Sequence, residues 1–490
     1  MNRFLLTVCI SITFCLSVQA QEILTLDAAL DFAYQNSPSL MQSKISMEQQ
    51  QLNLKAQKAS LKTQFSLKVN PFQYTRQNSY DNFNSTYYTN ENMTSSASLA
   101  ITQPIKWTDG SIGLYNDFDW RKAKNHRTNK EQTSFSHDMS LRITQPLFKY
   151  NKIKMELKEM EFSLQLAEMN YTLKHLNIEK NVTSNFYSVY QNQKSLATAQ
   201  EEFTKQQKNY EIIKNKVEAG LIPREELFQA EVNLLSSESA LKNQEIGFEN
   251  AKDAFKLLIG MELGSDIMLI PDTDIEIIDV DQEKAIGYAL KQRMELKQQE
   301  IGIEQGLFSI IRAKDNNSFS GNLTARVGLN GQAYDSPKDI YKGMNDNEVI
   351  GLSLDIPIFD WGTRKAKIRS AELSNESKEI AYEEEKKGIV LDIRKICRNL
   401  PILLSQIEIR RRNIENSERS YDINLEKYRN GHLTGMQLQD YQNQLTNAKN
   451  NYTNAIIKYK LELLNLKIQT LWDFQMDRSI LPQPGELLNK

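Results

Sequence analysis

Apolar side chains that recur at every seventh residue are the feature that most constrains how this chain can fold. They run through two segments on either side of a glycine: Val182, Val189, Leu196, Phe203, Tyr210 and Val217, then Leu227, Leu234, Leu241, Phe248 and Phe255. A sustained heptad is typical of long helices that pair along one apolar seam. Because the chain from Lys149 to Ala219 has neither Gly nor Pro, a continuous helix there would be about 100 Å long. Such a helix cannot bury its seam alone, so we expect it to pair with a return helix and with neighbouring subunits.

The whole pattern occurs twice. Adding 211 to each of the eleven positions again gives apolar residues: Ile393, Leu400, Ile407, Ile414, Tyr421, Tyr428, Leu438, Leu445, Tyr452, Tyr459 and Leu466. Gly220 and Gly431 keep the same offset. We expect each glycine to end its helix in the left-handed conformation that lets the chain reverse. The sequence therefore predicts a tandem duplication of one long helical hairpin.

A second, shorter duplication lies inside the first half. Near the start of the two halves the offset is 256 rather than 211, as between Ala29 and Ala285, so the first half carries 45 extra residues. Their origin is visible, because SLAITQPI at residues 98–105 recurs 42 residues later as SLRITQPL at 140–147. A strand-loop unit has been doubled there.

Strict alternation of apolar residues predicts strands in both halves, as at Ile350, Leu352, Leu354, Ile356 and Ile358. About ten alternating residues is the length of a tilted membrane strand. A half-buried sheet in a soluble protein gives the same alternation. The strands alone leave both interpretations open.

These patterns predict the following organisation. A signal peptide occupies residues 1–20. A first repeat spans 21–275, with short helices, strands with an extra hairpin at about 63–147, and a long helical hairpin at 148–262. A second repeat spans 276–475, with strands at about 318–358 and a helical hairpin at 361–474. A C-terminal tail follows at 476–490. Within the first helical segment, Thr25 is expected to cap the helix and Pro38 to divide it.

The N-terminal residues have the form of a secretory signal: Arg3, an apolar run, and Val18-Gln19-Ala20 before a cut ahead of Gln21. The alternative is a short anchor that is not cleaved. After residue 21 no stretch of 18 apolar residues appears. Residence in a membrane would therefore require a closed β-barrel.

Composition excludes several classes of protein. A net charge of -2 and a pI near 6.2 give no electrostatic footprint for nucleic acid. Three Cys and four scattered His supply neither a disulfide framework nor a metal cluster. No nucleophile-base arrangement or phosphate-binding loop is present, so we expect no enzymatic activity and no cofactor.

Several motifs in order give the chain a resemblance to the TolC family of outer-membrane channel-tunnel proteins, the outer membrane factors. They are LTLDAAL at 24–30, NSPSL at 36–40, QPLF at 145–148, IPIFDWG at 356–362, and the hairpin tips KVEAGLIP at 216–223 and KYRNGHLT at 427–434. Each motif is weak by itself. Their order, duplicated once behind a signal peptide, is specific.

The resemblance implies a mainly α protein with a β-barrel part. Tandem-duplicated coiled-coil hairpins would form a trimeric periplasmic α-barrel joined to a shared outer-membrane β-barrel. It implies a homotrimer in the outer-membrane lipid that passively exports drugs, other small molecules or secreted polypeptide. Its partners would be a periplasmic adaptor (membrane fusion) protein and an inner-membrane pump of the RND or ABC type. Family members use four strands per subunit. The doubled unit therefore implies either six strands per subunit and a wider barrel, or an extra hairpin that folds over the mouth of an unchanged barrel.

The resemblance also implies a periplasmic aperture at the hairpin tips, ringed by acidic side chains. The corresponding positions are Glu226, Gln437 and Asp440, of which Gln437 departs from the family by being neutral. Tyr428 occupies a position at which, in the family, the side chain helps to keep the tip closed. The alternatives are solvated charges on an outer helix face and, for Tyr428, simple packing in the seam. Six residues at the two tips are expected to contact the adaptor: Gly220, Leu221, Ile222, Gly431, His432 and Leu433.

A different class of function would also explain the signal peptide and the heptads. This is a periplasmic coiled-coil scaffold or adaptor without a pore. It does not explain alternating strands at matched positions of both halves. Salt washes would release such a scaffold from membranes, whereas a barrel would need detergent.

Overall fold

The computed structural model describes residues 22–83, 85–125, 130–272, 274–316 and 318–480. The chain divides into two compact units. The helical unit comprises Met1–Lys44, Tyr171–Arg293 and Lys387–Lys490, and the sheet unit comprises Ile45–Asn170 and Met294–Lys386. The predicted signal peptide lies outside the described residues. The boundaries proposed for the two repeats stay a prediction, since the units combine segments from both.

The helices of the two halves match in length, pair by pair. Both α1 (Leu26–Asn36) and α5 (Gln282–Gln292) have 11 residues. Likewise α2 (Pro38–Ser60) and α6 (Met294–Asn316) have 23. The long pair, α3 (Lys152–Glu218) and α7 (Thr363–Arg429), have 67, and α4 (Arg224–Ile259) and α8 (Gly435–Thr470) have 36. At about 1.5 Å per residue, α3 and α7 are each about 100 Å long.

Helix starts follow the same repeat. The side chain of Thr25 accepts a hydrogen bond from the backbone N–H of Ala28 and caps α1, as predicted. At the equivalent place 256 residues later, Asp281 accepts from the N–H groups of Glu283 and Lys284 and caps α5. Pro38 begins α2, as expected for a residue with no N–H to donate.

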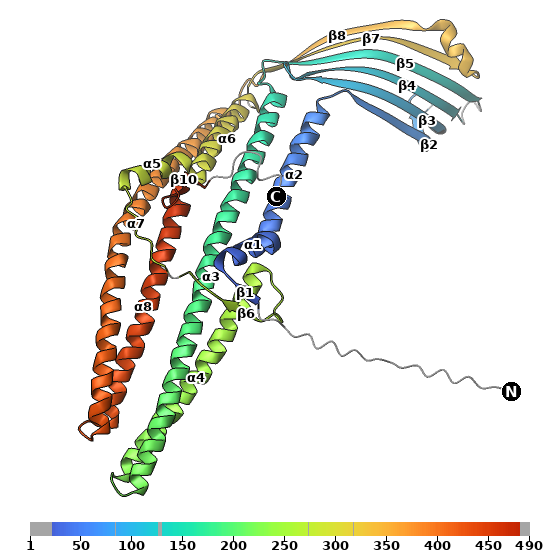
Figure 1. Ribbon diagram of the computed structural model, residues 1–490. Helices are drawn as coiled ribbons and strands as arrows, with labels where there is room; N and C mark the ends of the chain where they lie inside the picture. Colours follow the sequence, from blue (N-terminus) through green and yellow to red (C-terminus); the bar gives the residue numbers. More distant parts are fainter. Residues whose placement is uncertain (1–21, 84, 126–129, 273, 317, 481–490) are drawn as a thin grey trace, which may run out of the picture. The chain divides into compact units, whose positions relative to one another are not determined.

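The heptad residues form the core of the helical unit. Figure 1 shows α3 beside α4 and α7 beside α8, each pair an antiparallel hairpin. None of the 22 heptad side chains is exposed. Phe186 and the heptad residue Phe255 are fully buried and meet edge to face with ring centroids 6.0 Å apart. The heptad prediction is confirmed in both hairpins.

The sheet unit contains one antiparallel sheet with the strand order β2-β3-β4-β5-β7-β8 (Figure 1). Its strands are β2 (Gln64–Asp81), β3 (Thr86–Ile105), β4 (Gly110–Asn125), β5 (Lys130–Leu147), β7 (Ser320–Tyr334) and β8 (Asn345–Asp355). The 3-10 helix η1 (Pro337–Gly343) follows β7. Two-residue alternation gives this sheet two different faces. One carries polar side chains such as Ser98, Asp117 and Asp138, and the other carries a band of apolar side chains.

The apolar face of the sheet is largely uncovered within one chain. It carries Leu67 on β2, Leu99 on β3, Leu141 on β5, Val327 on β7 and Ile350 on β8, all of them exposed. The most exposed of these is Ile350, at 82%. Contiguous apolar surface of this extent marks a face that contacts another molecule or a lipid phase.

Shorter strands complete the helical unit. Strand β1 (Glu22–Leu24) pairs in parallel with β6 (Ile267–Leu269), and β9 (Trp472–Asp473) pairs with β10 (Arg478–Ser479). In the part of the chain that the structure describes, no helix combines the length and the apolar character needed to cross a membrane.

Gly260 ends α4 in a left-handed conformation, with φ at 82°, and a Cβ there would lie 2.6 Å from the carbonyl oxygen of Asn36. We therefore expect Gly260→Ala to destabilise the helical unit by about 2 kcal/mol or more. Thermal unfolding followed by circular dichroism measures this. Gly264→Ala is the matched control, because its Cβ would meet no atom within 4 Å. Equal midpoints for the two variants would contradict the prediction.

Candidate functional site: the hairpin tips

Each long hairpin reverses at a glycine. Gly220 and Gly431 have φ values of 71° and 77°, as predicted from the sequence. Just beyond each glycine, a backbone N–H reaches back to the last helical turn. Leu221 donates to the carbonyl of Lys216, and His432 donates to that of Lys427, both at 2.9 Å. These bonds satisfy carbonyls that the helix ends would leave unpaired.

The tips present a mixed surface. Gly220, Gly431 and His432 are exposed, and the Leu221 side chain is 72% exposed. Ile222 is half-buried. Leu433 is also half-buried, because it packs against the buried cluster of Tyr421, Leu438 and Leu445. The six predicted tip residues therefore divide into an accessible group and a group that anchors the turn.

Tyr428 joins both hairpins at the tip. Its ring packs on the Tyr421 cluster in α7 and α8, and Lys216 Nζ on α3 lies 5.9 Å from the centroid of the same ring. Burial, and then the negative charge of Glu226, raise the pKa of Tyr428, whereas the Asn209 contact acts in the opposite direction. A Cβ at Gly435 would lie 3.8 Å from Glu226 Oε2 and 4.0 Å from Tyr428 Cε2. Glu226 on α4 thus faces the start of α8.

Gln437 has a structural role that was not predicted from the sequence. Its Oε1 accepts a hydrogen bond from the backbone N–H of Thr434 at 3.1 Å, and its own N–H donates to Thr434 Oγ1 at 3.3 Å. This reciprocal pair is a capping box at the first turn of α8. The signal was present, because a Thr followed three residues later by Gln is its sequence signature. Asp440, three residues further along α8, is exposed.

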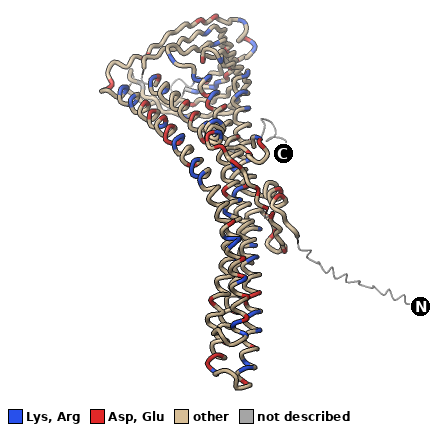
Figure 2. The backbone as a smooth tube through the Cα atoms, turned by 60° about the vertical axis from the view of Figure 1, so that its left-hand side comes forward, with Lys and Arg blue, Asp and Glu red and all other residues tan. Residues whose placement is uncertain are grey.

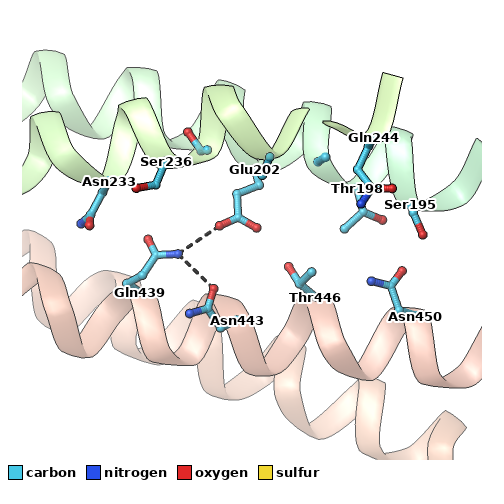
Figure 3. Close-up of a pocket in the computed structure, with 13 residues that line it drawn as sticks. Ser195, Thr198, Glu202, Asn233, Ser236, Gln244, Gln439, Asn443, Thr446 and Asn450 are labelled. Carbon is cyan, nitrogen blue, oxygen red and sulfur yellow. Dashed lines mark hydrogen bonds between the residues drawn. The ribbon is translucent and has the colours of Figure 1, made fainter. Parts of the chain in front are cut away.

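A polar groove of about 490 Å³ lies between the two hairpins, above the tips along the helices. Its lining comes from α3, α4 and α8 and consists mostly of Ser, Thr, Asn and Gln side chains (Figure 3). Gln439 lies across it and donates to Glu202 Oε1 at 3.0 Å and to Asn443 Oδ1 at 3.1 Å. Gln206 on α3 donates to Gln439 Oε1. The side-chain amides of Gln206 and Gln439 thus link α8 to α3 by hydrogen bonds at this polar groove.

An ion-pair cluster reinforces this link. Lys449 on α8 lies 3.7 Å from Glu201 on α3 and 3.9 Å from Glu418 on α7. Glu201 also pairs with Lys205, and that hydrogen bond is the main reason that its pKa is lowered. Figure 2 shows basic and acidic residues interspersed along the paired helices, without a region of one sign. Local ion pairs therefore link the two hairpins.

Comparison with known proteins decides the family. The sequence model of the outer membrane efflux protein family matches residues 111–260 and 285–467, which is 150 plus 183 residues and more than half of the chain. The chain belongs to the outer membrane efflux protein family. The resemblance drawn from the tip and strand motifs is confirmed. This is a family of channels rather than of enzymes, so the chain has a role in outer-membrane efflux.

Individual relatives agree in sequence and in fold. The outer membrane protein TolC of Salmonella enteritidis is 21% identical over 371 residues, which cover 73% of each chain. The CmeC outer membrane channel of Campylobacter jejuni has a TM-score of 0.70 at 17% identity, over 91% of this chain and 85% of the other. The open state of the MtrE outer membrane channel of Neisseria gonorrhoeae has a TM-score of 0.64 at 15% identity, over 92% and 89%. The predicted fold, long coiled-coil hairpins with a β part, is confirmed.

Tyr428→Phe tests the contact between the hairpins. It keeps the packed ring and removes the hydroxyl that meets Asn209. Losing a polar interaction between this hydroxyl and the other hairpin costs about 1 kcal/mol, so we expect hydrogen–deuterium exchange at residues 424–436 to quicken by about fivefold. Tyr421→Phe, one heptad earlier on the same seam, is the control and should change exchange less. Unaltered exchange in Tyr428→Phe would mean that Tyr428 contributes to the tip through packing of its ring and not through its hydroxyl.

Proposed function

We propose that three copies of this chain close into one conduit that passively exports solutes across the outer membrane. The observation that carries the proposal is the open sheet. In the described part of the chain, β2 and β8 are its edge strands, and its apolar face is uncovered. Open edges cannot persist in a lipid phase, where each unpaired backbone group costs several kcal/mol. Pairing β2 of one copy with β8 of the next removes every edge.

The two faces of the sheet support this arrangement. Strands of 11 to 20 residues exceed the ~9–11 that a tilted strand needs to cross the hydrocarbon core. The apolar face would contact lipid, and the polar face would line water. The matched 67-residue helices would pair with those of neighbouring copies and continue the conduit as a periplasmic tunnel, after export directed by a cleaved signal peptide.

The partners in this proposal are a periplasmic adaptor and an inner-membrane pump of the RND or ABC type. The exposed tip residues Gly220, Leu221, Gly431 and His432 offer a docking surface for the adaptor. The conduit itself supplies no energy, so pump and adaptor select the cargo, whether drugs, other small molecules or secreted polypeptide. Glu226, Gln437, Asp440 and Tyr428 would surround the periplasmic aperture.

Electron microscopy of the detergent-extracted protein tests the assembly. We expect a threefold particle with a tube on the order of 100 Å long, as the helix length requires. The protein should resist salt washes of the membrane and need detergent for release. A monomeric particle that salt releases would instead favour the scaffold without a pore.

Two substitutions test the aperture. Threefold symmetry brings three copies of each tip carboxylate together, and such rings attract cations. Asp440→Asn removes one ring and should lower the cation-to-anion permeability ratio in bilayer recordings. Gln437→Glu should raise that ratio, and it retains the capping box because Glu also serves at this position. The selectivity is read as the reversal potential under a salt gradient.

Controls separate charge from folding at the tip. Gln437→Ala removes the cap without adding charge, so it should cost about 1 kcal/mol of stability and leave the permeability ratio unchanged. Tyr428→Phe is expected to raise conductance if its hydroxyl holds the aperture closed. Identical ion selectivity in wild type, Asp440→Asn and Gln437→Glu would mean that these residues do not line the aperture.

A further inference from the structure

In the described part of the chain, the two halves contribute different numbers of strands to the large sheet. The second half contributes β7 and β8 to the sheet between α6 and α7, whereas the first contributes β2, β3, β4 and β5 between α2 and α3. The helices on either side match in length. The basic repeat therefore has two strands, and one additional hairpin is present in the first half.

The added hairpin reproduces its neighbour in its hydrogen bonds. At the end of β3, Gln103 donates through Nε2 to the carbonyls of Leu61 and Pro104, at 2.9 and 2.7 Å. At the end of β5, Gln145 donates in the same way to Thr108 and Pro146, at 2.7 and 2.8 Å. Each glutamine ties the end of its strand to the loop that precedes the partner strand. The two hairpins are therefore copies in structure as well as in sequence.

Backbone pairing places the copy inside the sheet. Strands β3 and β4 are in register from Asn90↔Asn125 to Ile105↔Gly110 without a shift. Strands β4 and β5 continue from Ser111↔Thr144 to Asn125↔Lys130, and β5 pairs with β7 from Ser134↔Tyr334 onward. A hairpin folded over the mouth would lack these ladders on both sides.

Side chains on the polar face fasten the same strands. Ser98 on β3 donates to Asp117 on β4. Arg142 on β5 lies 3.5 Å from Asp117 and 3.8 Å from Asp138. Arg326 on β7 pairs with Asp138. The chain of contacts crosses β3, β4, β5 and β7, so the added strands are tied to both neighbours.

We infer that the added hairpin is part of the barrel wall and that the assembly has a wide membrane section. This inference rests on the proposed trimer. Three copies of this chain, with six strands each, give a barrel of eighteen strands. Without the added hairpin each copy would have four strands, and the barrel would have twelve. With strands ~4.8 Å apart and tilted by about 40°, the barrel diameter rises from about 24 Å to about 36 Å. Of the two arrangements that the sequence left open, the pairing favours the wider barrel.

The extra width changes what can pass. Subtracting about 5 Å of side chain from each side of the lumen leaves about 14 Å for twelve strands and about 26 Å for eighteen. A pair of α-helices, each ~10–12 Å across, fits through the second opening and not through the first. The membrane section would then admit partly folded helical polypeptide, and cargo size would be limited at the helical aperture instead.

The repeat supplies a seamless test. Deleting residues 103–144 joins Thr102 to Gln145, restores SLAIT-QPLF across the junction, and removes β4 and β5 together. Most of the residues that would face β7 stay the same in kind, since Ser98, Leu99 and Ile101 replace Ser140, Leu141 and Ile143. Electron cryo-microscopy of the full chain and of the deletion variant should give eighteen and twelve strands, with diameters that differ by about 1.5-fold.

The outcomes separate the two proposals. A threefold particle of the full chain with a twelve-stranded wall would overturn the wide barrel and leave the conduit intact. A particle that is not trimeric would overturn the proposed function and this inference with it. If the deletion variant fails to fold, the strand count of the full chain still decides.

Cysteine labelling in the full chain provides a second measurement. In a Cys397→Ser background, which leaves no cysteine after residue 20, Asp119→Cys lies on the polar face of β4 and Leu114→Cys on its apolar face. In liposomes, a water-soluble maleimide should label Asp119→Cys and not Leu114→Cys. Equal labelling of both would mean that β4 lies outside the wall and would overturn the inference.

Discussion

The helical unit depends on burying an apolar seam that runs from Val182 to Val217, about half of a helix about 100 Å long. A single helix of that length has no core of its own, so its stability comes from the partner along its side. The chain supplies one partner by reversing at Gly220 and again at Gly431. Phe186 and Phe255, both fully buried, lie in this pairing. The tips are the ends of that seam, where packing on the Tyr421 cluster is joined by backbone and capping hydrogen bonds.

The sheet obeys a related constraint with a different solution. Its apolar residues also lie on one side only, because alternate side chains of a strand point to opposite faces. The helical seams find partners within the chain, whereas the apolar face of the sheet does not. Membership of an outer-membrane channel family supplies the physical context for that difference. The alternation that leaves one face of a sheet half-buried in a soluble protein leaves that face exposed in a single copy of this chain.

Much of this could be predicted from local patterns. The cap at Thr25, the break at Pro38 and the left-handed glycines each depend on residues within one turn of the chain, and the structure has all three. The candidate site was harder. By sequence Gln437 is a neutral residue where the family has an acidic one, whereas in the structure its side chain completes a capping box. Gln439 and Glu202, which link the hairpins across the polar groove, were missed because they are 237 residues apart and carry no periodic signal.

The sequence by itself determined the duplicated hairpins, the two-faced strands and the presence of one extra strand-loop unit, because periodicity and repeats are properties of the chain order. Only the tertiary structure decided where that unit goes. Strand pairing is a choice among distant segments, and it depends on backbone hydrogen bonds that leave no mark in the sequence. The same reason explains the meeting of Tyr428 with Asn209 and Glu226. Their proximity is set by the way two hairpins pack, and no spacing along the chain encodes it.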